Sequence, residues 1–254
     1  MKIEERIKMK MAEHGLGMDF HSKVEGYSVD LYRYEPSIGI KMSKIESYGK
    51  DIEQVIEVSG VRILAPIVDS GLIGFEVPRK ERRFPLQKTI YDGFNITIGV
   101  DILGNHKRID IREAPHMLVA GATGAGKSVF LGSLIKQLKE IPNAELVLLD
   151  PKMVELIEYS DGVRAYSSNF RVIEKILHDL TKEMDKRYKI LQGEKVKNIA
   201  ELVAKMPYIF VIIDEFGDLV TGKNENTSKQ SLLLLAQKAR AAGIHVILTT
   251  QRPS

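Results

Sequence analysis

The chain has 254 residues, 44% hydrophobic and 28% charged, an ordinary composition for a globular chain long enough to bury a substantial core. Its formal net charge of +3 does not by itself indicate a nucleic-acid partner, so positive charge for such a partner must be local or shared between subunits. The chain contains no cysteine, which excludes disulfides and cysteine metal sites and suits a reducing cytoplasm. No apolar run reaches the roughly 18–20 residues of a membrane-spanning helix, so we expect no membrane segment in this chain.

The first 90 residues predict a small α+β domain. Apolar residues at helical spacing alternate with runs rich in β-branched and aromatic residues, and Asp69-Ser70-Gly71 is typical of a hairpin turn. The predicted elements, in chain order, are a helix over 3–13, a strand over 24–34, a helix over 43–58 and a hairpin of 61–67 with 72–77.

Residues 91–254 predict a second domain in which strands and helices alternate. This order is typical of an α/β fold with a parallel sheet covered by helices on both faces, and the strands are nearly continuous apolar runs, as buried parallel strands are. The predicted strands cover 117–120, 146–149, 208–213 and 244–249, and the predicted helices cover 127–139, 170–191 and 228–242.

A glycine-rich segment between the first strand and the first helix of this domain fits the phosphate-binding pattern G-x-x-x-x-G-K-[ST]. Its glycines let successive backbone N–H groups point into one concavity, and the following helix adds its positive amino-terminal end. Lys127 can reach the β- and γ-phosphates, and Ser128 can ligate Mg²⁺. The predicted nucleotide-binding residues are Gly121, Ala122, Thr123, Gly124, Ala125, Gly126, Lys127 and Ser128.

Two acidic residues, Asp214 and Glu215, follow the predicted strand 208–213. A carboxylate pair at the end of a buried strand needs a partner, and hydrated Mg²⁺ is the natural one. We expect Asp214 to hold the metal's water shell and Glu215 to orient the attacking water. The alternative is a capping Asp at a strand end, which would explain one acid but less easily two acids beside a phosphate-binding loop.

Two further side chains have both a functional and a structural interpretation. Gln251 follows the next strand, and ligands of open parallel sheets bind outside the carboxyl ends of strands, so Gln251 could contact the γ-phosphate or could be a polar loop residue. Arg240, within Ala239-Arg240-Ala241-Ala242-Gly243, could complete a neighbouring subunit's ATP site. The residues alone favour a solvated arginine near a helix end.

Asp150-Pro151-Lys152 follows the second predicted strand of this domain, again at the expected ligand edge. Asp150 or Lys152 could order the nucleotide site or a subunit contact, and a simple turn explains the segment equally well.

Several segments together resemble the motor of the FtsK/SpoIIIE DNA translocases. They are HMLVAGATGAGKSVFLGSLI, LVLLDPKMVEL, MDKRYKIL, PYIFVIIDEFGDL and QKARAAGIHVILTTQRPS, and in the first domain YRYEPSIGIKMSKI, VRILAPI and GFEVPRKERR resemble the family's α domain. The resemblance implies a RecA-like P-loop NTPase domain preceded by an FtsK alpha-like domain. It further implies a homo-hexameric ring that encircles double-stranded DNA and moves along it by ATP hydrolysis.

The resemblance also implies roles for individual residues. Lys127 and Ser128 match the Walker A lysine and serine, and Asp214 with Glu215 matches the Walker B pair. Arg240 matches the arginine that acts on the neighbouring subunit, and Arg252 stands where the family's first DNA-facing loop begins. Family members continue past QRPS with further strands, whereas this sequence stops at Ser254, so we interpret the second domain as truncated at its carboxyl end.

Two other functions remain open at this stage. A conjugative or phage DNA-pumping ATPase would use the same site with other partners. A nucleotide-binding assembly module would use the site without motor activity.

Overall fold

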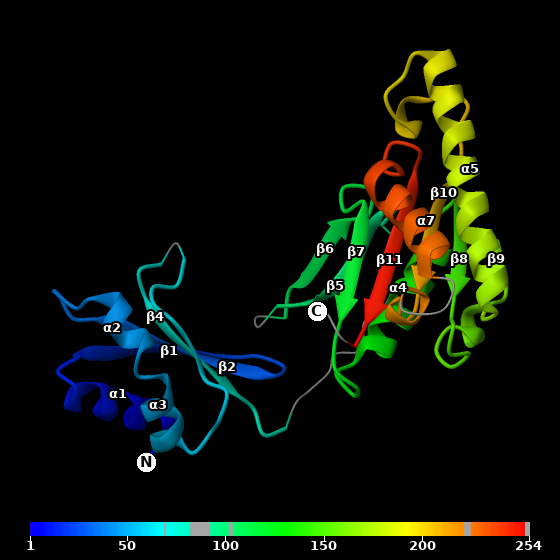
Figure 1. The fold of residues 1–254 in the computed structure, drawn as a ribbon. Helices are drawn as coiled ribbons and strands as arrows, with labels where there is room; N and C mark the ends of the chain where they lie inside the picture. The colour runs from blue at the N-terminus through cyan, green and yellow to red at the C-terminus, as the bar shows by residue number, and fades with distance from the viewer. Residues whose placement is uncertain (69, 82–91, 102–103, 221–224, 252–254) are drawn as a thin grey trace. The chain divides into compact units, whose positions relative to one another are not determined.

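The computed structural model describes residues 1–68, 70–81, 92–101, 104–220 and 225–251 (Figure 1). The chain divides into two compact units, Met1–Lys88 with Gly99–Lys107 and Thr89–Ile98 with Arg108–Ser254. The domain boundary predicted after residue 90 lies outside the described residues, so it remains a prediction.

The first unit contains a four-stranded antiparallel sheet in the order β1-β2-β4-β3. Its helices supply one apolar layer over the sheet, with Ile7 and Met11 of the first helix and Ile52 of the third fully buried beside Tyr34 and Phe75. The strands are β1 (Met18–Glu25), β2 (Val29–Pro36), β3 (Arg62–Leu64) and β4 (Ile73–Pro78), and the helices are α1 (Ile3–Glu13), α2 (Met42–Glu46) and α3 (Gly49–Ile56).

Two predictions for this unit were wrong. The single strand predicted over 24–34 is a hairpin, because the chain reverses after β1 and the Gly26 N–H donates to the Val29 carbonyl at 3.0 Å. The single helix predicted over 43–58 is two helices. The Ser47 hydroxyl donates to the Lys44 carbonyl and the Tyr48 N–H to the Ile45 carbonyl, so the chain turns between α2 and α3.

The second unit is built on a five-stranded sheet in the order β7-β11-β10-β8-β9, in which every neighbouring pair is parallel. This confirms the predicted α/β fold with a parallel sheet. The strands are β7 (His116–Ala120), β8 (Ala144–Leu149), β9 (Ala165–Ser167), β10 (Tyr208–Ile213) and β11 (Ile244–Thr250), and the helices are α4 (Lys127–Lys139), α5 (Phe170–Glu194), α6 (Gly217–Val220) and α7 (Glu225–Lys238).

Alternate residues of the central strands enter two different apolar cores. Val211 and Ile213 face α5 and α7, whereas Phe210 and Ile212 face α4, and all four are fully buried. Helices therefore cover both faces of the sheet (Figure 1). Burial on both faces explains why these strands are continuous apolar runs in the sequence.

Sequence patterning missed the short or polar elements and misplaced the end of α5 and both ends of α7. It gave no strand for β9 or for the separate two-stranded sheet of β5 (Asn95–Val100) and β6 (His106–Asp110). The helix predicted over 228–242 is α7, which ends at Lys238, because Gly243 with a φ of 67° opens the turn into β11. Among the described residues, no helix is long and apolar enough to cross a membrane.

His245 lies at the amino-terminal end of β11 and is 1% exposed. Its Nδ1 donates to the Pro115 carbonyl at 3.0 Å, and its ring stacks on Phe210 with centroids 5.4 Å apart. Burial lowers the pKa of His245 to about 4, because the imidazolium would lose its hydration. The imidazole is thus a neutral part of the core.

We predict that acid destabilises the second unit through His245. Its pKa is near 6.5 in the unfolded chain and about 4 in the folded one, so the unfolded state binds the proton first as the pH falls. The free energy of unfolding should drop by about 1.4 kcal/mol per pH unit between pH 6.5 and 4 from this group. Denaturant titrations should show a shallower pH dependence in His245→Phe, and an unchanged slope in that variant would contradict the prediction.

Candidate functional site

The glycine-rich loop connects the carboxyl end of β7 to the amino end of α4, as predicted. Gly124 and Gly126 adopt φ values of 79° and 97°, a left-handed region in which a side chain would be strained. The Gly121 N–H donates to the Thr250 carbonyl at 3.2 Å, which ties the loop to the end of β11. The loop therefore has the backbone shape and the helix amino terminus that bind phosphate oxygens.

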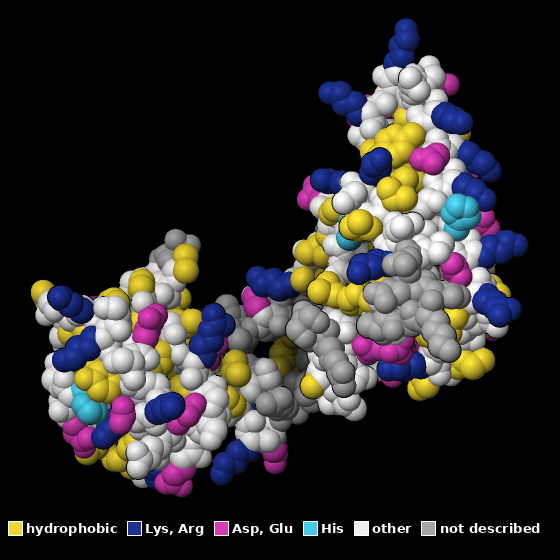
Figure 2. All heavy atoms as spheres, viewed as in Figure 1, with side chains coloured by type: hydrophobic (Ala, Val, Ile, Leu, Met, Phe, Trp, Pro, Cys, Tyr) yellow, Lys and Arg dark blue, Asp and Glu magenta, His cyan; other side chains and the backbone are white. Residues whose placement is uncertain are grey.

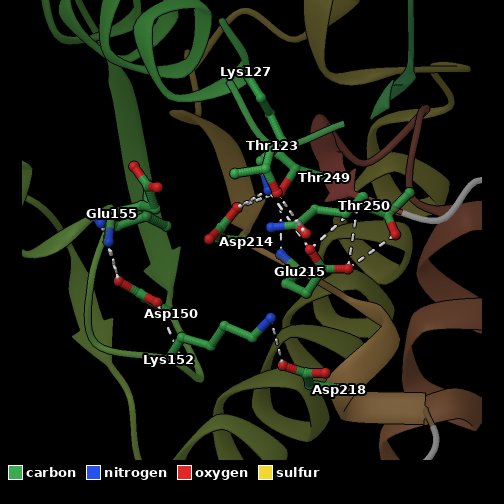
Figure 3. A network of polar contacts seen from close by, with 12 residues as sticks. Thr123, Lys127, Asp150, Lys152, Glu155, Asp214, Glu215, Asp218, Thr249 and Thr250 are labelled. Atoms are coloured by element: carbon green, nitrogen blue, oxygen red, sulfur yellow. Dashed lines mark hydrogen bonds and ion pairs between the residues drawn. The ribbon is translucent and has the colours of Figure 1, made fainter. Parts of the chain in front are cut away.

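The central contact of the site joins Lys127 to the two acids after β10. The Lys127 Nζ lies 3.1 Å from the Asp214 Oδ1 and 3.7 Å from the Glu215 Oε2 (Figure 3). All three side chains are at most 9% exposed. The structure thus places the glycine-rich loop and the carboxylate pair, 87 residues apart in sequence, at one edge of the sheet.

Thr249, near the end of β11, aligns both acids. Its hydroxyl donates to the Asp214 carboxylate and accepts the Glu215 N–H at 3.1 Å. Sequence reasoning missed this residue, because its contact with the acids depends on the pairing of β11 with β10. Its contacts fix the direction of the Asp214 carboxylate.

Gln251 joins the site through both its backbone and its side chain. Its N–H lies 3.2 Å from each Glu215 carboxylate oxygen, and its Oε1 accepts the Thr123 hydroxyl at 3.3 Å. Formally, one ammonium faces two carboxylates in this cluster. An oxygen-rich site with this excess of negative charge suits a hard divalent cation, and Ser128, the exposed second residue of α4, lies next to Lys127.

Arg240 lies away from these residues. It is exposed in the turn between α7 and β11 and lines a cavity of about 610 Å³ together with Lys197, Tyr208 and His245. These residues mark the amino-terminal edge of the sheet, opposite the glycine-rich loop. The expectation that Arg240 lies on a helix was wrong, since α7 ends two residues before it. Arg252 lies outside the described residues.

Asp150 has a local role in ordering its own loop. Its carboxylate is fully buried and accepts the backbone N–H groups of Lys152, Glu155 and Leu156 at 3.0–3.2 Å. This geometry favours the turn interpretation for Asp150. Lys152 instead reaches Asp218 of α6 at 3.4 Å, bridging the loops after β8 and β10 (Figure 3).

Comparison with known proteins identifies the family. The profile of the FtsK/SpoIIIE family matches residues 85–206 and 200–254, and that of the FtsK alpha domain matches residues 1–79. The chain belongs to the FtsK/SpoIIIE family. The recognition made from its sequence motifs is thereby confirmed.

Curated relatives in this family are considerably longer than the chain. It is 36% identical to DNA translocase FtsK of Borreliella burgdorferi, over 91% of this chain and 32% of the relative. It is 35% identical to DNA translocase SftA of Bacillus subtilis, over 91% of this chain and 27% of the relative. The chain thus spans about a third of the length of the relatives it matches.

Solved structures show the same fold at lower identity. The monomer of the pCW3 conjugation coupling protein TcpA superposes with a TM-score of 0.63 and 23% identity, covering 100% of this chain and 78% of that one. The cytoplasmic domain of the type VII secretion ATPase EccC of Thermomonospora curvata gives a TM-score of 0.54 and 21% identity, over 67% and 21% of the two chains. The second unit therefore has the fold of P-loop ATPases.

We predict that Lys127→Ala lowers the free energy of unfolding of the second unit by about 3 kcal/mol, because it leaves two buried carboxylates without their cation. Denaturant titration without nucleotide should detect this loss. Lys136→Ala removes an exposed lysine from the same helix and should change stability by less than about 0.5 kcal/mol. Equal stability of the two variants would mean that the Lys127 contact contributes nothing to the fold.

Proposed function

We propose that this chain binds ATP with Mg²⁺ and hydrolyses it. The observation that carries the proposal is the 3.1 Å contact between Lys127 and Asp214, because it joins the end of the glycine-rich loop to a carboxylate that suits a divalent cation. Loop N–H groups from Gly121 to Gly126 and the Lys127 ammonium would hold the phosphates. Ser128 and Asp214 would hold Mg²⁺, which neutralises charge on the phosphate oxygens.

The remaining site residues would act on the attacking water and the departing phosphate. Glu215 would orient the water, and Gln251, which lies beside Glu215 and Thr123, would contact the γ-phosphate. Arg240 at the opposite edge of the sheet would reach the ATP site of a neighbouring subunit. This division of roles suits a head-to-tail ring, in which each subunit presents a different surface to each of its neighbours.

We propose further that hydrolysis moves double-stranded DNA through a homo-hexamer in the cytoplasm. Membership of the FtsK/SpoIIIE family and the names of the curated relatives support this partner and activity, and the absence of cysteine suits the compartment. Basic side chains stand among acidic ones over the second unit (Figure 2), in keeping with the net charge of +3. DNA would therefore meet charge shared around a ring, including Arg252, through contacts to its phosphates.

We predict that Glu215→Gln retains ATP binding and loses turnover. Glutamine keeps the size and polarity of the side chain but cannot accept the water's proton, so kcat should fall by about 100-fold or more. Equilibrium binding of ATP and the rate of phosphate release, with and without linear duplex DNA, measure the two effects. Glu194→Gln, an exposed acid at the end of α5, should behave as the wild type.

The same assay discriminates between the functions. DNA-stimulated turnover in the Glu215→Gln variant would refute the role of Glu215. A wild-type chain that self-associates with ATP and is indifferent to DNA would instead support an assembly module.

We predict that Arg240→Ala lowers turnover on the order of 1000-fold and that mixing rescues it. Glu215→Gln subunits cannot turn over but retain Arg240, so they should restore activity to neighbouring Arg240→Ala subunits. In a 1:1 mixture, about a quarter of head-to-tail interfaces would pair an intact site with an intact arginine. Lys238→Ala, which changes a nearby cation of the same cavity, is the matched control. No activity in the mixture would exclude action of Arg240 on a neighbour.

A further inference from the structure

The Glu215 carboxylate is held by the last residues of β11. Its Oε1 accepts the Thr250 hydroxyl at 3.0 Å and the Gln251 N–H at 3.2 Å, and its Oε2 lies 3.2 Å from the same N–H (Figure 3). Glu215 is 7% exposed and Thr250 1% exposed. These buried contacts set the direction in which the carboxylate points.

The backbone of Glu215 is attached to the same strand. Its N–H donates to the Thr249 hydroxyl, and the next N–H, of Phe216, donates to the Thr249 carbonyl at 3.0 Å. Glu215 adopts a φ of 48°, a left-handed conformation that is costly for a residue with a side chain. Such a conformation persists because the surrounding contacts enforce it, and here those contacts come from the end of β11.

A carboxylate that orients a water must direct an oxygen at it from about 2.6–3.2 Å. Both oxygens of Glu215 are already engaged by donors of Thr250, the last residue of β11, and of Gln251, the residue after it, and Oε2 also lies 3.7 Å from the Lys127 ammonium. These contacts fix the directions of the lone pairs that remain for a water, so a change in the direction in which the carboxylate presents an oxygen requires that the contacts with the end of β11 loosen.

We propose that Thr250, together with the Gln251 N–H, is a restraint that holds Glu215 in a resting orientation and releases it when the carboxyl end of β11 shifts. This inference deepens the proposed function and rests on it. Thr250 is thus a positioning residue, because it acts through Glu215.

Gln251 is suited to transmit such a shift. Its backbone contacts Glu215, its side chain contacts Thr123 of the phosphate-binding loop, and the next residue is Arg252, which we propose to meet DNA. The body of β11 is fixed by parallel pairing to β7 and β10 on its two sides. A pull on the chain after Gln251 would therefore displace the end of the strand first, where the Glu215 contacts lie.

The test compares Thr250→Val, which removes the hydroxyl at nearly constant volume, with Thr250→Ser, which keeps a hydroxyl. We expect Thr250→Val to raise kcat without DNA by about tenfold, the scale of losing one hydrogen bond to a charged group. The KM for ATP should change less than about twofold. The ratio of kcat with linear duplex DNA to kcat without it should fall toward one. Thr250→Ser should keep the wild-type stimulation ratio.

Thr181→Val is the matched control, because it removes another buried hydroxyl, bonded to the His178 carbonyl within α5, far along the chain from the site. It should change neither kcat nor the response to DNA. A lower kcat in Thr250→Val, or an unchanged kcat with full DNA stimulation, would overturn the restraint.

Amide hydrogen exchange followed by NMR gives a readout that needs no turnover. The Gln251 N–H should exchange about tenfold faster in Thr250→Val than in the wild type, because its acceptor is freed to turn. An unchanged exchange rate would also overturn the restraint. If DNA does not change the turnover of the wild-type chain, the proposal that DNA is the partner fails. The role of Thr250 is still tested in that case, by the exchange rate of the Gln251 N–H and by kcat measured without DNA.

Discussion

The site depends on one buried ion pair, in which Lys127 of the glycine-rich loop meets Asp214 after β10. The pair is costly to desolvate, and further contacts support both members: Asp214 accepts the Thr249 hydroxyl, and the Lys127 ammonium also lies 3.7 Å from Glu215. In the proposed function, a phosphate group would replace Asp214 as the partner of Lys127, and a divalent cation would replace Lys127 as the partner of Asp214. In the proposed function, the ion pair would hold Lys127 and Asp214 close to the positions from which they contact those ligands.

The parallel sheet explains why these residues meet. Carboxyl ends of parallel strands share one edge, so β7, β10 and β11 deliver the loop, the acids and the Thr249–Gln251 segment to the same place. Val211 and Ile212 anchor β10 in opposite cores, which leaves the strand little freedom to slide. The sheet supplies rigidity, and the short polar segments after its strands supply the chemistry.

The sequence predicted the parts of the fold with strong periodicity or long apolar runs. Helix 127–139 and strand 208–213 match α4 and β10 to the residue. Three-residue β9 and the break between α2 and α3 escaped prediction, because single hydrogen bonds and tertiary contacts set them rather than a repeating pattern. In the site, the glycine-rich loop and both acids were evident from spacing. The role of Thr249 depends on which strands lie side by side, which sequence alone did not specify.

Arg240 and the glycine-rich loop lie at opposite edges of the sheet, so one copy cannot bring both to the same nucleotide. β11 has seven residues and begins just after the Arg240 turn, so its two ends lie roughly 20 Å apart at about 3.3 Å per residue. An arginine side chain cannot cover that distance to its own phosphate-binding loop. With Arg240 in its proposed role, no isolated copy holds a complete catalytic centre. ATP hydrolysis would then occur only at the interface between two copies, so dilution that separates the copies would stop it.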